Sequence, residues 1–363
     1  MRRKKIIQIL PQLNTGGAER FVVDLCNKMV ENHEIVLFSF FPLETHGFFL
    51  KELNGHVKVK SFNKEKGIDL ILPFRILLEL IREKPQIIHT HLNSFYYVLL
   101  STIVLRNGNY FHTLHSDALK EAPGKWGVFI KKLIFKIGLS TPVTVSSKSQ
   151  LGFFEHYKFK AIKIDNGRNI DLAQVANNKF FLDNFRKNPD TKILINIARI
   201  SHEKNQIMLA NAVNELTKEG HNIVLIFLGA NRDKVISKTI ENIQNKNIHL
   251  IGEKDNPLDY LAAADAFCLT SLYEGMPITI IEAFALGIIP ICTPAGGIVD
   301  MIENNVNGLI SKDLSKEEYL TILKKFIAMS DEELGVMKSN CQNSFSKYSM
   351  EKCANKYLEL FDK

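Results

Sequence analysis

The 363-residue sequence predicts an α/β protein built from two doubly wound domains that face each other across a cleft. Short apolar runs of strand length alternate with helical stretches, the alternation restarts after about residue 190, and a polar stretch over 166–189 separates the two series. Such alternation indicates parallel sheets covered on both faces, and at ~150 residues per domain the length accommodates two. We expect domains over 1–170 and 171–346, with a C-terminal helix over about 347–363 that packs back on the first.

The first series begins with an apolar run that a Gly16-Gly17 turn separates from a helix over about 19–30. An amphipathic helix over 73–83 ends before Pro85, because proline cannot continue a helix. Another helix is expected over 95–105. The strands of this series are expected at 6–10, 35–41, 87–91, 110–115 and 142–146.

The second series repeats the pattern, with its clearest helix over 206–218. Its strands are expected at 192–198, 223–229, 248–252, 266–270 and 289–293. In open parallel sheets, ligands bind beyond the carboxyl ends of the strands. Polar residues at those ends are therefore the candidates for a functional site, and two facing sheets would place that site in the cleft.

Composition excludes several classes of protein. Charged residues make up 23% of the chain and hydrophobic residues 45%, which indicates a globular rather than a disordered protein. The five cysteines include no CxxC pair, which argues against a disulfide framework and a thiolate zinc site. No apolar run reaches the roughly 18 residues that cross a bilayer, and the first run is too short for a signal peptide. We expect a cytoplasmic protein.

Charge is unevenly distributed along the chain. Residues 1–170 hold 25 Lys and Arg against 14 Asp and Glu, a balance of +11, whereas the whole chain carries +7. A basic first half suggests an anionic partner, which could be a nucleic acid, a phosphorylated substrate or an acidic membrane surface. The alternative is that these are ordinary solubilising lysines.

Gly16 and Gly17 follow the first strand and open a helix. Glycines let the backbone approach a ligand closely, and a helix N-terminus offers free N–H groups to an anion. The pattern is not the GxGxxG of dinucleotide-binding proteins. A plain tight turn explains it equally well.

Arg199 and Lys204 lie at the carboxyl end of the strand expected at 192–198. Two cations there can grip a diphosphate, because the Arg fork suits phosphate oxygens and Lys adds a point charge. The alternative is a surface loop in which Glu203 and Lys204 form a solvated pair.

The densest signal is the segment 273–283, which contains Glu274, Pro277 and Glu282. Proline suits the first position of a helix, so we expect a helix that starts at Pro277, with exposed N–H groups just beside it. Both carboxylates could then accept hydrogen bonds from the hydroxyls of one sugar ligand. The alternative is a capped helix with a surface acid, but an unpaired carboxylate in so apolar a stretch is unusual.

His91 and His115 each end an expected strand, where ligands of parallel sheets bind. A lone histidine is more often structural, but two at matching strand ends favour a site. The chain has no HExxH motif, and no DxD motif to hold a divalent ion against a diphosphate. We therefore expect no metal.

The stretch 125–136 holds the only tryptophan, Trp126, four lysines and several large apolar residues. As a helix it would be basic on one side and apolar on the other, which is typical of a helix that lies on an anionic membrane surface. The alternative is a helix whose apolar face packs on the sheet of the first domain.

These features together resemble the retaining glycosyltransferases of family four, which have the GT-B fold of two Rossmann-like domains. The resemblance covers nearly the whole chain and is most specific in the second half. The matching residues there are Arg199, Glu203-Lys204-Asn205, Asp265, Glu274 to Pro277, Glu282-Ala283, Gly296-Gly297 and Asn307-Gly308-Leu309. Those in the first half are Gly16 to Arg20, His91, His115, Ser146 and Asn166-Gly167.

The resemblance implies roles for the residues of the second domain. Arg199 and Lys204 would hold the donor diphosphate and offset its charge as it leaves. Glu274 would contact the donor sugar, and Glu282 would bind the ribose hydroxyls. The donor contacts that it implies are Gly16, Gly17, Arg199, Lys204, Gly252, Glu274, Gly275, Met276, Pro277, Ile278 and Glu282.

In the first domain, the resemblance implies that Gly17 approaches the diphosphate and that His115 lies beside the transferred sugar. Asn14 and His91 would join His115 on the acceptor side. The residues expected to carry catalysis are His115, Arg199, Lys204 and Glu274.

The chain departs from the family pattern at three places. Ala198 stands where the family usually has Gly, and residues 164–171 read IDNGRNID where IPNGVD is usual. The segment from Glu274 reads EGMP in place of the commoner Glu-x-Phe-Gly. This last change leaves both glutamates in register and bears on the choice of donor.

We predict metal-independent, retaining transfer of a sugar from a nucleotide sugar, with UDP as the nucleotide, to a glycan. The acceptor would be a lipid-linked or cell-surface polysaccharide precursor, met in the cytoplasm or on the inner face of the cytoplasmic membrane. Stabilisation of the leaving diphosphate would carry the chemistry. Nucleic acid is not expected as a partner, because it does not explain the two glutamates.

Two other functions remain open at this point. A UDP-sugar 2-epimerase would share the fold and the diphosphate site but would need no acceptor. A non-catalytic subunit that binds nucleotide sugars within a glycan assembly complex would be expected to have lost one of Arg199, Lys204, Glu274 and Glu282, and all four are present.

Overall fold

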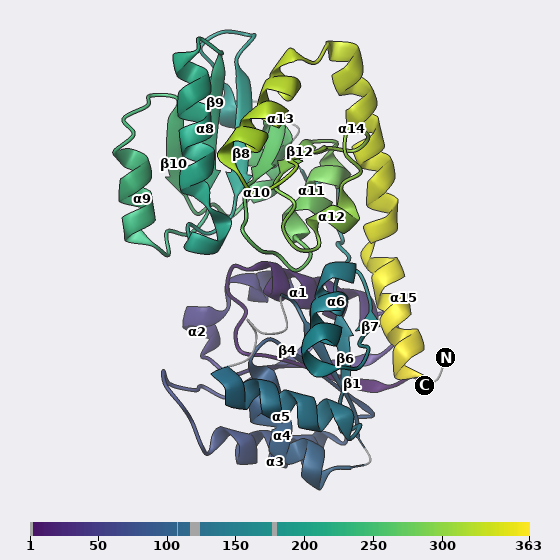
Figure 1. Ribbon diagram of the computed structural model, residues 1–363. Helices are drawn as coiled ribbons and strands as arrows, with labels where there is room; N and C mark the ends of the chain where they lie inside the picture. The colour runs from purple at the N-terminus through teal and green to yellow at the C-terminus, as the bar shows by residue number, and fades with distance from the viewer. Residues whose placement is uncertain (1–2, 107, 117–123, 176–179) are drawn as a thin grey trace. The chain divides into compact units, whose positions relative to one another are not determined.

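The computed structural model describes residues 3–106, 108–116, 124–175 and 180–363 (Figure 1). The chain divides into two compact units. Unit 1 comprises residues 1–169 and 348–363, and unit 2 comprises 170–347. Each unit is built on a parallel sheet with helices on it, so the predicted α/β class with two Rossmann-like sheets is confirmed.

Unit 1 contains a seven-stranded sheet in the order β3-β2-β1-β4-β5-β6-β7, with every strand pair parallel. Because β1, β4 and β5 are neighbours, the residues that follow them meet at one edge. The strands are β1 (Lys5–Leu10), β2 (Glu34–Ser39), β3 (Lys58–Ser61), β4 (Ile87–His91), β5 (Asn109–Leu114), β6 (Thr141–Thr144) and β7 (Ile162–Lys163).

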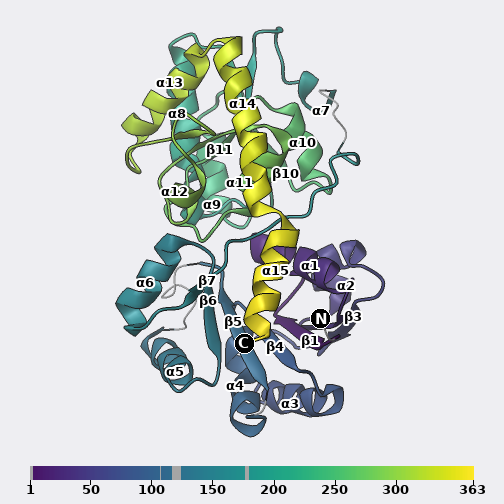
Figure 2. The same cartoon turned by 90° about the vertical axis from the view of Figure 1, so that its right-hand side faces the viewer.

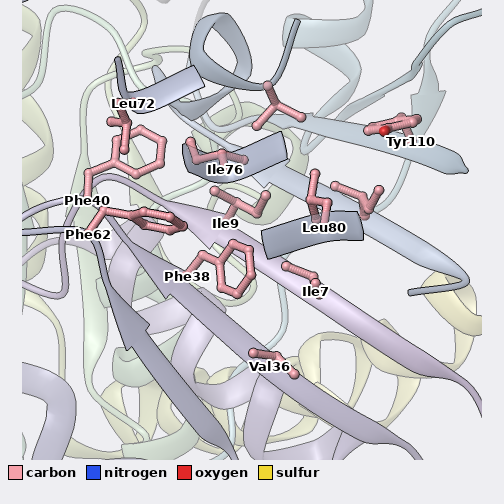
Figure 3. Close-up of a cluster of buried hydrophobic side chains, with 12 residues drawn as sticks. Ile7, Ile9, Val36, Phe38, Phe40, Phe62, Leu72, Ile76, Leu80 and Tyr110 are labelled. Atoms are coloured by element: carbon pink, nitrogen blue, oxygen red, sulfur yellow. The ribbon is translucent and has the colours of Figure 1, made fainter. Parts of the chain in front are cut away.

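Helices cover the sheet of unit 1, and apolar side chains from strands and helices form its core. One buried cluster joins residues of β1 and β2, such as Ile9 and Phe38, to Ile76 and Leu80 of α3 (Figure 3). The helices are α1 (Gly17–Met29), α2 (Leu43–His46), the 3₁₀ turn η1 (Phe48–Glu52), α3 (Leu72–Glu83), α4 (Ser94–Val104), α5 (Gly124–Lys136), α6 (Ser147–Tyr157) and α15 (Met350–Phe361).

Unit 2 contains a six-stranded parallel sheet in the order β10-β9-β8-β11-β12-β13. Its strands are β8 (Lys192–Ile197), β9 (Ile223–Leu228), β10 (Ile248–Gly252), β11 (Ala266–Leu269), β12 (Ile289–Cys292) and β13 (Leu309–Ile310). Its helices are α7 (Phe180–Asp183), η2 (His202–Lys204), α8 (Gln206–Lys218), α9 (Lys234–Glu241), α10 (Pro257–Ala263), α11 (Ile278–Leu286), α12 (Ile298–Met301), α13 (Lys316–Ala328) and α14 (Asp331–Phe345). The turn η3 (Ser346–Tyr348) spans the boundary with unit 1.

Two of the expected strands extend two residues beyond the ends that the structure shows. The second strand stops at Ser39 because the next two amides, of Phe40 and Phe41, bond the carbonyl oxygen of Pro11 instead of continuing the sheet. The strand expected over 142–146 stops at Thr144, because Ser146 caps α6 and its hydroxyl accepts the amide of Ser149.

The C-terminal helix α15 belongs to unit 1, where it packs against α1. The hydroxyls of Thr113 on β5 and Tyr357 on α15 lie 2.9 Å apart. Gly167 allows this packing, because a Cβ there would overlap the backbone of Met350 and the side chain of Cys353. The glycine matched to the family pattern at this point therefore has a structural use in this chain.

Arg168, which stands where the family usually has valine, forms a buried ion pair with Asp24 of α1, with Nη1 2.6 Å from Oδ2. Burial raises the pKa of Asp24, although Arg168 and the amide of Asn169 oppose this shift. Arg168, although it departs from the family pattern, thus has an ion-pair partner within unit 1.

We predict that Arg168→Ala lowers the free energy of unfolding by about 3–5 kcal/mol, because it leaves the Asp24 carboxylate buried without its cation. Urea denaturation measures this loss. Lys28→Ala, which breaks an exposed ion pair with Glu31 just beyond the end of α1, is the control and is expected to cost less than about 1 kcal/mol. Equal losses in the two variants would contradict the prediction.

Candidate active site

In unit 2, the loop after β8 carries the two predicted cations. Gln206, fully buried at the start of α8, shapes this loop because its Nε2 donates to the carbonyl oxygen of Arg199 at 2.8 Å. The Arg199 guanidinium extends outward and donates to Glu203 Oε1 from both Nε, at 2.9 Å, and Nη2, at 2.7 Å. Glu203 thus pairs with Arg199 and not with Lys204, which corrects the pairing considered from the sequence.

The carboxylate of Glu203 is held ionised by this arrangement. Burial raises its pKa, but hydrogen bonds from the backbone and from Arg199 outweigh burial and leave the pKa below its ordinary value. The carbonyl oxygen of Glu203 also accepts the amide of Leu272, in the loop after β11. Two loops at the carboxyl edge of the sheet are thereby tied together.

Lys204 and Glu274 form the central contact of unit 2. Lys204 Nζ donates to Glu274 Oε1 at 2.6 Å, and the hydroxyl of Ser271 donates to the same oxygen at 2.5 Å. Both ionic side chains are mostly buried. Residues 70 positions apart therefore present a cation and a carboxylate side by side at the end of β8 and β11.

Glycine is required behind this contact. Gly296 has a φ of +56°, and a Cβ on it would overlap the backbone carbonyl of Glu274. The next residue, Gly297, donates its amide to the carbonyl oxygen of Gly275 at 2.8 Å. The loop after β12 therefore sets the position of the Glu274 loop by direct backbone packing.

The helix that follows Glu274 begins one residue later than expected. Pro277 has extended backbone angles and precedes α11, whose first residue is Ile278. The amides of Ile278 and Thr279 belong to the first turn, which a helix cannot satisfy internally, and they give this end a partial positive charge. Glu282 lies in the second turn and is buried. Met276 and Ile278 are buried as well.

Gly252 ends β10 in an exposed position with a φ of +72°, and its carbonyl oxygen accepts the amide of Gly229 at 2.9 Å. Gly229 in turn packs on the backbone of Ala198, next to Arg199. Asp265, which matched the family pattern, lies at the opposite edge of the sheet. Its Oδ2 accepts the amide of Ile193 at 2.7 Å, so it supports the start of β8 rather than the site.

In unit 1, Gly16 precedes α1 and Gly17 is its first residue, exposed at the carboxyl edge of the sheet. A side chain at Gly16 would overlap the carboxylate of Glu19, which reaches back to the helix N-terminus. Asn14 lies in the same loop, with its Nδ2 3.3 Å from Gln12 Oε1.

His91 and His115 are brought together, as their matching strand ends predicted. His91 Nδ1 and His115 Nε2 are 3.0 Å apart. His91 is fully buried and His115 is half-buried. Burial lowers the pKa of both imidazoles, so both rings are neutral near pH 7. His91 and His115 thus lie in contact at the carboxyl edge of the sheet of unit 1.

The position of α5 contradicts part of the prediction that residues 125–136 form a membrane-surface helix. Lys131, expected on a basic surface, is fully buried: its Nζ is 3.2 Å from His112 Nε2 and 5.5 Å from the ring centre of Tyr96. Phe135 is also in the core, whereas Trp126 is 79% exposed and Phe129 is exposed with it. One face of α5 packs on the unit, and the other presents aromatic side chains outward.

Exposed apolar side chains also lie on the helices next to α5 and just before α3. The helices α3, α4 and α5 lie next to one another on one face of the sheet in both views (Figure 1, Figure 2). We call the following residues the apolar face: Ile68, Leu70, Ile71, Phe74, Leu78, Ile81, Ile103, Val104, Trp126, Phe129, Leu133 and Ile137, all exposed. Exposed basic residues on or beside these helices are Arg75, Arg82, Lys84, Arg106, Lys125 and Lys136.

Several contacts were not foreseen from the sequence. Gln8 in unit 1 and Ser271 in unit 2 are polar residues in largely apolar stretches, which is the one sequence signal that could have drawn attention to them. Gln206 follows the polar residues 201–205 and carries no such signal. The five cysteines are free and buried. Within the described ranges, no group of three or more His, Cys, Asp or Glu could hold a metal ion. No helix in that part of the chain has the length and apolar character needed to cross a membrane.

Two family models match the chain. The model described as Glycosyltransferase Family 4 matches residues 15–167, and the model described as Glycosyl transferases group 1 matches residues 177–343. The first match lies within unit 1 and the second within unit 2. Together they cover most of the chain.

Individual relatives are similar at low identity. The capsular polysaccharide biosynthesis glycosyltransferase CapH of Staphylococcus aureus is 27% identical over 305 residues, which cover 77% of this chain and 78% of CapH. An alpha-1,4-N-acetyl-D-galactosaminyltransferase of Campylobacter jejuni, named for a glycan acceptor on PP-undecaprenol, is 25% identical over 365 residues, covering 90% and 89%. The solved structure of HepE from Anabaena with UDP-glucose superposes with a TM-score of 0.83 at 18% identity, covering 99% of this chain and 100% of HepE.

Proposed function

Because the chain belongs to the glycosyltransferases of group 1 and family 4, with the GT-B fold, we propose that it transfers a sugar from a UDP-sugar to a lipid-linked glycan, with retention of configuration and without a metal ion. The observation that carries this proposal is the contact between Lys204 Nζ and Glu274 Oε1, 2.6 Å apart at the carboxyl edge of unit 2. A cation for phosphate and a carboxylate for sugar hydroxyls stand there beside a helix N-terminus.

Unit 2 would bind the donor. Arg199 and Lys204 would each contact the diphosphate and offset the charge that builds up as the glycosidic bond breaks. The first-turn amides of α11 would add hydrogen bonds to phosphate or sugar. Glu274 would accept from donor-sugar hydroxyls, and Glu282, one turn further along the helix, would accept from the ribose.

Unit 1 would bind the acceptor and complete the donor site. Gly17, exposed at the N-terminus of α1, would approach the diphosphate, and His115 would lie beside the transferred sugar, with Asn14 and His91 near it.

The relatives support the substrate classes. HepE was solved with UDP-glucose, which favours UDP as the nucleotide. The Campylobacter enzyme is named for a PP-undecaprenol acceptor, and CapH is named for capsular polysaccharide, which favours a lipid-linked polysaccharide precursor. We propose that this chain meets its acceptor in the cytoplasm, at the inner face of the cytoplasmic membrane.

Titration calorimetry with UDP and UMP, both in EDTA, tests the donor site. UDP is expected to bind at least about tenfold more tightly than UMP, because only UDP offers the second phosphate to Arg199 and Lys204. A charge-assisted hydrogen bond to that phosphate contributes about 1.5–3 kcal/mol. Equal affinities, or UDP binding that appears only with magnesium or manganese, would contradict a metal-independent diphosphate site.

The apolar face supports docking on an anionic membrane. Monomeric proteins rarely expose so many large apolar side chains together, and α5 places Trp126 and Phe129 beside Lys125 and Lys136. Helix α4 carries no charged side chain, and α5 carries no acidic one. Aromatic side chains would enter the headgroup region while the lysines attract anionic lipid.

We predict that the protein co-sediments with anionic vesicles, and less so as salt rises. Lys125→Glu with Lys136→Glu should weaken binding at least about thirtyfold, since each basic residue near the surface contributes about 1 kcal/mol. Trp126→Ser with Phe129→Ser should also weaken it. The control is Val235→Ser with Val336→Ser, two exposed apolar residues of unit 2. Binding that all variants retain would overturn the docking face.

A further inference from the structure

A buried run of side-chain hydrogen bonds crosses three neighbouring strands of unit 1. Gln8 lies on β1, His91 at the end of β4 and His115 just after β5. Gln8 Oε1 is 2.8 Å from His91 Nε2, and His91 Nδ1 is 3.0 Å from His115 Nε2. Each imidazole nitrogen of His91 therefore has one partner, and the run leads from the core to the half-buried His115.

The surroundings of Gln8 fix which way its amide points. Its Nε2 faces the thioether sulfur of Met29 at 3.9 Å, on the side away from His91. A thioether can accept a weak hydrogen bond but cannot donate one. With the amide reversed, the buried carbonyl oxygen would face this sulfur and find no donor, which is costly in a core. The amide oxygen must therefore face His91.

This orientation dictates the protonation of both histidines. A neutral imidazole carries a hydrogen on one nitrogen and a lone pair on the other. His91 must donate from Nε2 to Gln8, so its Nδ1 carries the lone pair. His115 must then donate from Nε2 to His91, which leaves the lone pair of His115 on Nδ1. The neighbouring ring of His89 bonds Thr113 and takes no part in this run.

We propose that Gln8 is a positioning residue which, through His91, fixes His115 as the tautomer that carries its hydrogen on Nε2 and accepts hydrogen bonds at Nδ1. His115 would then receive a hydroxyl of the bound sugar at Nδ1 rather than donate to one. The use for a sugar rests on the proposed function. The tautomer itself does not, because it follows from contacts within unit 1.

Long-range ¹H–¹⁵N correlation spectra of ¹⁵N-histidine-labelled protein near neutral pH report each tautomer. The His115 signals are assigned by their loss in His115→Gln. The wild-type chain is expected to show hydrogen on Nε2 of both His115 and His91, and the opposite tautomer at His115 would overturn the proposal without any variant. Turnover is not needed for this readout, so it stands or falls separately from the transferase activity.

Gln8→Met removes the acceptor oxygen at similar volume, and it is expected to convert His115 to a mixture of tautomers while the His89 signals stay unchanged. Gln8→Glu keeps an acceptor oxygen and should retain the wild-type tautomer. Where transfer is measured, kcat should fall about tenfold in Gln8→Met. This is part of what a well-placed proton-transfer or hydroxyl-binding group contributes to the rate. The value of kcat should recover in Gln8→Glu. An unchanged His115 signal in Gln8→Met would refute the role of Gln8.

Discussion

Lys204→Ala and Arg199→Ala are each expected to lower kcat/KM for sugar transfer about 100–1,000-fold. Removal of one prepositioned charge that stabilises the departing group has effects of this size. In Lys204→Ala the loss has a second source, because the Glu274 carboxylate loses the cation 2.6 Å from it and would repel the diphosphate. Steady-state kinetics with a UDP-sugar and a glycan acceptor give the values.

Lys338→Ala, at an exposed lysine of α14, is the matched control and should change kcat/KM less than twofold. Thermal unfolding checks that the site variants remain folded, as expected for Arg199, whose side chain is largely exposed. A loss of kcat/KM below about threefold in both site variants would contradict the assignment of Arg199 and Lys204 to the donor diphosphate.

Gly296→Ala is expected to lower kcat/KM at least about 100-fold without touching a charged group. A Cβ at Gly296 cannot coexist with the carbonyl of Glu274, so the Glu274 loop must move. Misplacement of a binding group by about 1 Å can cost about 100-fold in rate. Kinetics give the first value, and urea denaturation gives the accompanying change in stability.

The control for backbone strain is Gly220→Ala. Gly220 also has a positive φ, +93°, but a Cβ there meets nothing within 4 Å. Both variants pay about 1–2 kcal/mol for alanine in a left-handed conformation, and only Gly296→Ala also displaces Glu274. Equal activities in the two variants would show that Gly296 does not position the site.

Most of the fold could be predicted because buried strands of parallel sheets are continuous apolar runs. The run at 192–198 and the helix over 206–218 are examples, and the structure reproduces that helix as α8. The strand β3 was missed because its sequence, KVKS, is mostly polar at the edge of the sheet. The strands β7 and β13 have two residues each, too few for any periodicity.

The sequence could predict which types of residue stand at the strand ends of the site, but it could not predict which of them contact one another. No local pattern tells that Lys204 pairs with Glu274, because the pair is made by the order of β8 and β11 in the sheet. Lys131 was misplaced for a similar reason. A lysine among aromatic residues reads as a membrane-surface residue, yet its charged end packs over the rings of Phe95 and Tyr96.

The central claim is that this glycosyltransferase moves a sugar from UDP to a lipid-linked glycan through the group around Lys204 and Glu274. The direct measurement is UDP release from a panel of UDP-sugars in EDTA, with and without an undecaprenyl-diphosphate-linked glycan, together with mass spectrometry of the lipid. We predict UDP release that depends on acceptor for at least one donor, and a lipid product heavier by one sugar residue. UDP release that is equally fast without acceptor, with no change in lipid mass, would contradict it.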